Sequence, residues 1–124
     1  MASRPLITPH SVIKDGDMSG DIVSDVTIIQ NTTLISYEIS WVGTTPVGTL
    51  SVEVSNDYSQ NVDGTVRAPG KWTELPLSIT PAVSGNTDNG FIDITELAAY
   101  AIRIKYNRTS GVGTMQAIIV AKVA

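Results

Sequence analysis

Apolar and polar residues alternate along most of the chain, which is the pattern of β-strands that bury one face. The clearest run spans residues 32–42, where Glu38 and several serines separate the apolar positions, and residues 49–55 repeat it. A turn-rich segment, 43–48, separates the two runs, so we predict that they form a hairpin. The side chains expected to point inward are Ile35, Tyr37, Ile39, Trp41, Leu50, Val52 and Val54.

A second hairpin is predicted over residues 100–123. Its first arm alternates, its glycine-containing turn covers residues 109–113, and its second arm, 115–123, is apolar on both faces. One face of that arm belongs in a core, whereas Ile118 and Val120 lie on the other face. Either the hairpin is central to a two-layer domain, or this face is reserved for another subunit.

Two segments of the chain do not show regular alternation. Residues 1–20 contain Pro5 and Pro9 and predict an extended N-terminal arm, which lies over its own domain or reaches a neighbouring subunit. Residues 56–70 are rich in Asn, Asp, Gly and Pro and predict a long loop.

The segment that precedes the second hairpin departs from strand alternation. Asp93 and Glu96 resemble a capping box, and Ile94 and Leu97 have helical spacing, so we predict one short helical turn near 94–98. The chain as a whole predicts an all-β fold, an antiparallel β-sandwich or jelly roll of about seven or eight strands. We expect one β-sandwich domain over residues 21–124, preceded by the arm.

The composition narrows the classes of partner. Apolar residues make up 42% of the chain and charged residues 16%, so the surface consists mostly of uncharged polar groups and suits broad, static protein contacts. The net charge is −4, and the eight Lys and Arg are scattered singly, which argues against tight nucleic-acid binding. We expect no membrane partner either, because the apolar runs are too short to span a bilayer and the N-terminal residues do not form a signal peptide.

No catalytic, cofactor or metal site is predicted. The chain has no cysteine, and its one histidine, His10, lies in the arm outside any nucleophile motif. Residues 15–21 resemble a calcium loop, but Val26 stands where the bidentate glutamate would be. Glu38 and Glu53 would be cross-strand neighbours in the predicted hairpin, on a solvated face.

A glycan site is the alternative prediction from the residues themselves. Tyr58 is the one aromatic residue that we expect to be exposed, because it lies in the long loop. An exposed ring beside Asn56 and Asp57 would offer a stacking platform with hydrogen-bonding groups.

The stretches 47–57 and 72–75, followed by 91–94 and 100–114, together resemble small virion structural proteins of tailed bacteriophages. The resemblance covers about the last two-thirds of the chain. It implies a β-sandwich or jelly roll that coats or cements a capsid, or that sits in the tail or neck.

The resemblance implies a non-enzymatic structural component, made in the host cytoplasm and located in the virion. We expect a capsid decoration or cement protein that bridges major capsid subunits, and a homo-oligomer, with a trimer favoured. The alternative is a tail or neck module that binds host-surface glycan through Asn56, Asp57 and Tyr58. The residues expected to contact other subunits or the capsid are Pro5, Leu6, Ile7, Pro9, Ile118 and Val120.

Overall fold

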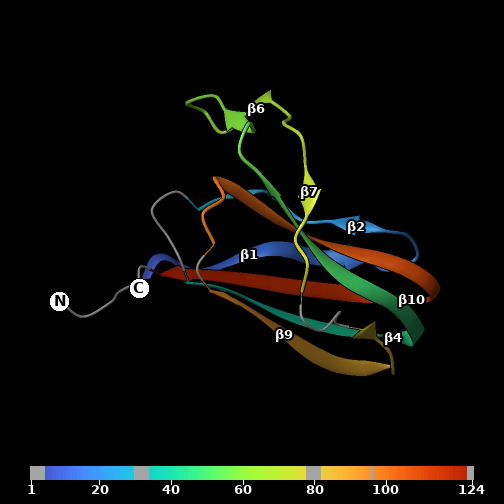
Figure 1. Cartoon of the computed structure of the whole chain (residues 1–124). Helices are drawn as coiled ribbons and strands as arrows, with labels where there is room; N and C mark the ends of the chain where they lie inside the picture. Colours follow the sequence, from blue (N-terminus) through green and yellow to red (C-terminus); the bar gives the residue numbers. More distant parts are fainter. Residues whose placement is uncertain (1–4, 30–33, 78–81, 96, 123–124) are drawn as a thin grey trace.

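The structure, a computed structural model, describes residues 5–29, 34–77, 82–95 and 97–122. All regular elements in this part of the chain are β-strands, paired antiparallel (Figure 1). These residues include no helix long and apolar enough to cross a membrane. The strands are β1 (Pro5–Asp17), β2 (Ile22–Val23), β3 (Thr27–Ile28), β4 (Leu34–Ser55), β5 (Ser59–Gln60), β6 (Val66–Ala68), β7 (Thr73–Glu74), β8 (Ala82–Val83), β9 (Thr87–Thr95) and β10 (Ala101–Lys122).

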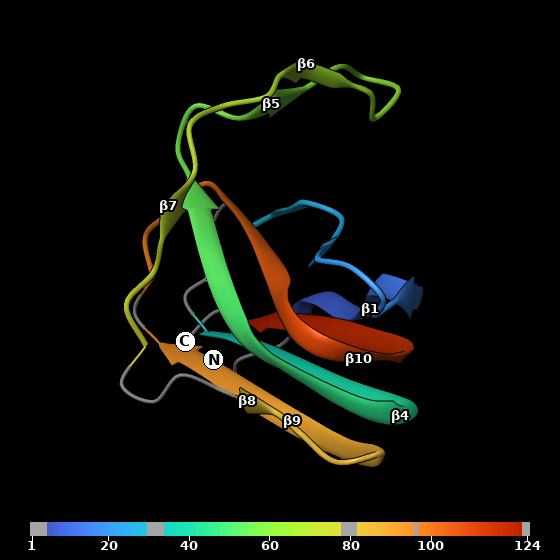
Figure 2. The ribbon, with the colours of Figure 1, turned by 90° about the vertical axis from the view of Figure 1, so that its right-hand side faces the viewer.

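Two long strands organise the fold. β4 and β10 each span 22 residues and pair with each other from Ala101 opposite Ser55 to Lys122 opposite Leu34. Figure 2 shows that they bend together midway, so that each strand contributes one half to each of two layers. Layer one contains β9, residues 34–42 of β4, residues 114–122 of β10, and β1. Layer two contains β7, β8, the other halves of β4 and β10, β2 and β3. The β-sandwich predicted from the sequence is therefore confirmed.

The bend is built from residues that permit close approach of the two backbones. Gly43 pairs with Gly113, and a Cβ at Gly113 would lie 2.7 Å from the carbonyl oxygen of Val42. Gly111 has φ 80°, and Thr45, whose backbone lies against it, has φ 45°, both in the left-handed region. Register shifts between Arg108 and Val112 mark a bulge. We call this region the corner.

The corner also changes which residues point into the core. In β4, odd-numbered residues are buried up to Trp41, and even-numbered residues are buried from Pro46 to Val52. β10 makes the matching change between Tyr106 and Met115. An extra residue in each strand therefore directs the apolar side chains of both halves toward the space between the layers.

The two predicted hairpins are wrong, although their strands are correct. Segments 43–48 and 109–113 do not reverse the chain but bend two strands that pair with each other. The predicted inward positions are confirmed, since Tyr37, Ile39, Leu50 and Val52 are almost fully buried and Val54 packs against the core. The core further includes Met18, Ile29, Ile92, Ile94, Ile102, Ile104, Tyr106, Met115, Ala117, Ile119 and Ala121.

The predicted helical turn is also wrong. Ile94 and Thr95 belong to β9, which pairs with β4 along its whole length, and the described residues that follow, 97–99, are irregular. Burial of Ile92 and Ile94 against the core stabilises the strand by more than a local capping pattern stabilises one turn. Glu96 lies outside the described residues.

The segment predicted as an arm forms β1. It pairs antiparallel with β10 at the edge of layer one, and Val12 and Ile13 are buried in the core of the same chain. Four register shifts interrupt the pairing. The following turn buries Met18, whose backbone N donates to the carbonyl oxygen of Gly113 at 2.9 Å.

Candidate interaction surfaces

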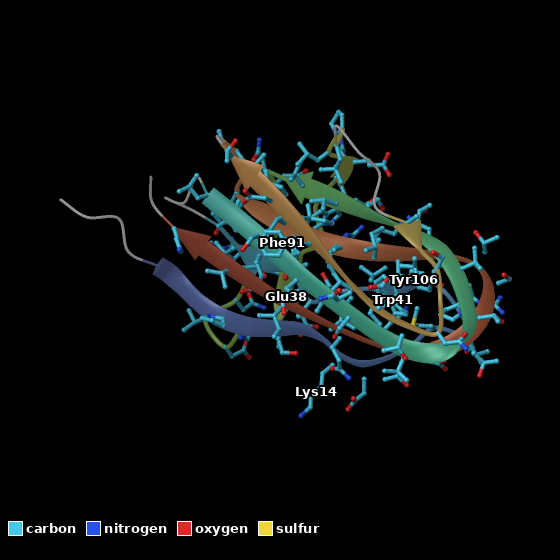
Figure 3. The ribbon with its side chains drawn as sticks, turned by 90° about the horizontal axis from the view of Figure 1, so that it is seen from below. Lys14, Glu38, Trp41, Phe91 and Tyr106 are labelled. Atoms are coloured by element: carbon cyan, nitrogen blue, oxygen red, sulfur yellow. The ribbon has the colours of Figure 1, made fainter. Side chains whose placement is uncertain are left out.

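The outer face of layer one, opposite the core, exposes large apolar side chains. We define it by the outward-pointing residues of 9–17, 34–42, 87–95 and 114–122. Val42 is 63% exposed, Phe91 62% and Ile118 40%. Ile118 lies opposite Glu38, and Glu38 lies opposite Phe91, so one row crosses three strands. Figure 3 labels Glu38 and Phe91 of this row. The carboxylate of Glu38 therefore lies between the apolar side chains of Ile118 and Phe91.

A shallow groove lies at one end of the outer face. Its volume is about 290 Å³, and its walls include Leu34, Phe91, Asp93, Val120 and Lys122. The groove combines apolar walls with one carboxylate and one ammonium group, so it fits a mixed protein surface better than a uniformly charged ligand.

The structure brings together part of the predicted contact set. Ile118 is exposed and Val120 half-buried on the outer face, and β1 pairs with the same half of β10. Pro9 is exposed. Pro5 and Ile7 pair with Lys122 and Ala121 through the backbone, whereas the side chains of residues 5–8, including Leu6, lie outside the described part.

Phe91 and Val42 were missed as surface residues. The sequence predicts no strand at Phe91, which lies just before the predicted helical turn, although its alternation with Ile92 and Ile94 indicates a strand in which Phe91 points outward. Val42 was the last apolar residue before a predicted turn. It has the same parity as the exposed residues Glu38 and Ser40 and directly follows buried Trp41, which marks it as outward.

A second surface is the hairpin of β5 and β6, which projects away from both layers (Figure 2). We call residues 56–72 the projecting hairpin. Val62 at its tip is fully exposed and Val66 is 56% exposed. The sequence predicted this segment as a loop, because the two strands contain too few residues to show alternation.

Aromatic and charged side chains hold the base of the projecting hairpin. The rings of Tyr58 and Trp72 lie 5.7 Å apart at an interplanar angle of 56°. The guanidinium of Arg103 lies 4.2 Å from the centre of the Trp72 ring and donates to Glu53 Oε1 at 2.8 Å through Nε. Lys105 Nζ lies 3.8 Å from the other oxygen of Glu53.

The predicted exposure of Tyr58 is wrong. Its side chain is 5% exposed, because Trp72, 14 positions later in the sequence, folds back over it. The polar groups beside it serve the hairpin base: Asn56 Oδ1 accepts from Tyr100 N at 2.9 Å, and Asp57 Oδ1 accepts from Lys71 N at 2.7 Å. Asn56 and Asp57 do line an open groove of about 360 Å³ with Lys71. The aromatic stacking platform expected for a glycan is not available there.

Hydrogen bonds set the electrostatics of this base. The backbone N–H of Lys71 and the hydroxyl of Ser55 both donate to Asp57, and together they lower the pKa of its carboxyl below the ordinary value of 3.8. Asp57 therefore stays ionised, and its charge ties the two ends of the projecting hairpin together.

The carboxylates of residues 15–21, the segment that resembles a calcium loop, accept hydrogen bonds from separate partners. Asp15 Oδ1 accepts from Gln116, Asp17 Oδ1 from the backbone N of Ser19, and Asp21 Oδ1 from the backbone N of Arg108. Within the described residues no group of three or more His, Asp or Glu side chains could hold a metal ion. Glu38 and Glu53, predicted as cross-strand neighbours, lie in different layers.

Comparison with known proteins shows the fold. No protein-family profile and no curated protein sequence matches this chain. Similar solved structures include the SPBc2 prophage-derived protein YomS, with TM-score 0.52 and 8% identity, covering 97% of this chain and 96% of that one. The VP2 protein of infectious bursal disease virus, in derived T=1 particles, has TM-score 0.57 and 10% identity and is matched over 97% of this chain. The chain spans about a third of VP2, since the match covers 32% of that protein.

Proposed function

We propose that this protein is a non-enzymatic structural component of a bacteriophage particle, and that it decorates or cements the capsid by bridging major capsid subunits. The observation that carries the proposal is the outer face of layer one, where Val42, Phe91 and Ile118 expose apolar side chains on three neighbouring strands. Large apolar side chains exposed on one face of a sheet are typical of protein interaction surfaces.

The fold likenesses support this proposal. One of the similar structures is a prophage-derived protein, and another is VP2 in T=1 particles. Within each layer the strands bond one another through their backbones, so on the outer face the side chains make the contacts.

The projecting hairpin supplies a second kind of contact. It extends from the end of layer two, and its exposed tip valines, Val62 and Val66, lie away from the outer face. A subunit that rests on one neighbour through its outer face reaches another through the hairpin. Under particle symmetry, many modest contacts of this kind add to a large barrier against disassembly.

The decisive experiment is to find the protein in particles. Phage particles from the lysate that contains this protein are purified on a density gradient, and the fractions are probed with an antibody raised against the full chain. We expect the protein in the particle fractions, at many copies per particle by quantitative mass spectrometry. Its confinement to the soluble fractions would overturn the proposal.

Variants then test the surface. Ile118→Asp is expected to reduce the occupancy of particles at least tenfold, because it places a charge in the middle of an apolar contact. Val23→Asp is the matched control, since Val23 is 51% exposed but lies on β2 in layer two. Both variants are checked for an unchanged melting temperature. Equal occupancy of the two variants would exclude the outer face as the docking surface.

The glycan alternative has its own outcome. If the protein ignores purified shells but binds host cells, then the groove of Asn56, Asp57 and Lys71 becomes the surface to test. Asp57→Asn would then reduce binding to cells, while Ile118→Asp would leave it unchanged.

A further inference from the structure

β9 forms one edge of layer one, and β4 pairs with one of its two sides. In the part of the chain that the structure describes, β4 is the only strand that pairs with β9. The register runs from Leu34 opposite Thr95 to Val42 opposite Thr87 without a shift. The far side of β9 therefore presents a straight row of backbone N–H and C=O groups.

One hydrogen bond identifies which residues of β9 direct their backbone N–H and C=O groups toward the free edge. Gly43 N donates to the carbonyl oxygen of Asn86 at 2.7 Å, in line with the β4–β9 register. Because bonded pairs alternate in an antiparallel ladder, residues 88, 90, 92 and 94 bond β4, whereas 87, 89, 91, 93 and 95 face the free edge. Accordingly, Asn89 N donates to the Asp88 side chain at 2.8 Å instead of to β4.

The opposite edge of the same layer is protected against strand addition, and β9 is not. β1 contains Pro5, Pro9 and Lys14, and four register shifts twist its pairing. Prolines, lysines and bulges are the usual protection of a free edge. The nine residues of β9 include no proline and no lysine, and its pairing has no shift. This contrast indicates an edge that is covered in the working assembly.

We propose that β9 pairs antiparallel with β9 of a second copy of this chain, about a two-fold axis at Phe91. In this register Phe91 lies opposite its own copy, Asp93 opposite Asn89, and Thr95 opposite Thr87. All five residues have exposed side chains and backbone groups directed to the free edge, and every pair can be hydrogen-bonded once Asn89 N exchanges the Asp88 carboxylate for the carbonyl oxygen of Asp93 in the other copy.

The self-pairing is complementary in charge and in apolar surface. No two carboxylates of the row face each other, because Asp93 meets an amide. Phe91, which is 62% exposed, meets a second Phe91, and cross-strand aromatic pairs stabilise antiparallel sheets. The two copies of layer one join into one continuous layer, with both outer faces on the same side. This inference does not depend on a role in a particle.

A cysteine substitution tests the register directly. The chain contains no cysteine, so Phe91→Cys introduces one thiol per copy. Opposed residues of a hydrogen-bonded pair have Cα atoms about 5.5 Å apart, within the range of a disulfide. Mild oxidation is expected to give a covalent dimer. The control is Val42→Cys, equally exposed but on β4. Equal crosslinking of both variants, or none at position 91, would overturn the proposal.

Charge substitutions at Asn89 test the same pairing without a covalent bond. Asn89→Asp opposes Asp93 of the other copy at two symmetric places, and we expect the dissociation constant to rise about tenfold. Asn89→Lys places an ammonium group there instead and is expected to lower it. If the two variants change the dissociation constant in the same direction, the register is wrong.

The mass in solution completes the test. Light scattering on the full chain is expected to show an even number of copies, and Phe91→Lys, which opposes two ammonium groups, is expected to halve that mass. The trimer favoured by the sequence resemblance, or a monomer at every concentration, would overturn the proposal.

Discussion

The guanidinium of Arg103 lies 4.2 Å from the centre of the Trp72 ring. Arg103 belongs to β10, in the middle of layer two, whereas Trp72 closes the projecting hairpin. Because Arg103 also forms an ion pair with Glu53 of β4, at 2.7 Å from Nη2 to Oε1, one side chain connects the hairpin to both long strands. The contact therefore controls how firmly the hairpin is held without contributing to the core.

Trp72→Ala is expected to loosen the projecting hairpin and leave the sandwich folded. The variant loses the contact with Arg103 and the ring packing on Tyr58, which together are worth about 1–2 kcal/mol. Amide hydrogen exchange of residues 58–71 should accelerate about tenfold. Val66→Ala, on an exposed part of the same hairpin, is the control. Acceleration spread evenly over the whole chain would contradict this account.

Low pH should weaken the contacts of Asp57 at the base of the projecting hairpin. The pKa of Asp57 is lowered in the folded state, so its contacts stabilise the hairpin fully above about pH 3.8 and lose that effect as the pH falls through the lowered folded value. Hydrogen exchange of Lys71, referenced to its intrinsic pH dependence, should rise in that acid range. Asp57→Asn should remove this pH dependence, whereas Asp25→Asn should preserve it.

Two buried tyrosines predict opposite effects of the same substitution. The hydroxyl of Tyr37 is buried and has no hydrogen-bond partner among the described residues, and burial raises the pKa of this phenol far above its usual range. Tyr106 donates its hydroxyl to the carbonyl oxygen of Val47 at 3.2 Å. Tyr37→Phe should raise the free energy of unfolding by about 1 kcal/mol, and Tyr106→Phe should lower it by about as much. Urea denaturation measures both, and effects of the same sign would refute the prediction.

The corner should tolerate no side chain at Gly111. A Cβ there would lie 2.7 Å from the Cα of Pro46, in addition to the strain of φ 80°. Gly111→Ala is therefore expected to cost about 3 kcal/mol or more. Gly85→Ala is the matched control, because Gly85 has φ 84° but open space around its Cβ, and it should cost about 1 kcal/mol. Equal losses of stability would show that backbone strain alone decides the effect.

Side-chain alternation predicted the inward faces because it is a local property. Ile35 to Trp41 and Ile102 to Tyr106 are buried as expected, since burial of one face requires only a period of two. The pairing partner of a strand, in contrast, is not a local property of the sequence. Gly43 and Gly48 indicate a break in alternation, but the same residues serve a turn or a corner, and only pairing with the distant β10 decides between them.

A signal for the corner was nevertheless present in the sequence. Buried positions change from odd to even between Trp41 and Leu50, and from even to odd between Tyr106 and Met115. Two glycine-containing breaks with matching changes of parity indicate two bent strands lying side by side. Tyr58 offered no comparable signal, because the ring that covers it comes from Trp72 and not from a neighbouring position.

The two shared strands have a consequence for how the molecule is made. Neither layer is complete until β10 lies beside β4, and long-range pairing of this kind slows folding because a large loop must close first. During synthesis, β4 therefore emerges from the ribosome well before the strand that covers it. The apolar side of β4 stays open to chaperones and to other nascent chains during that interval, and folding of the domain follows the translation of residue 122 instead of accompanying it.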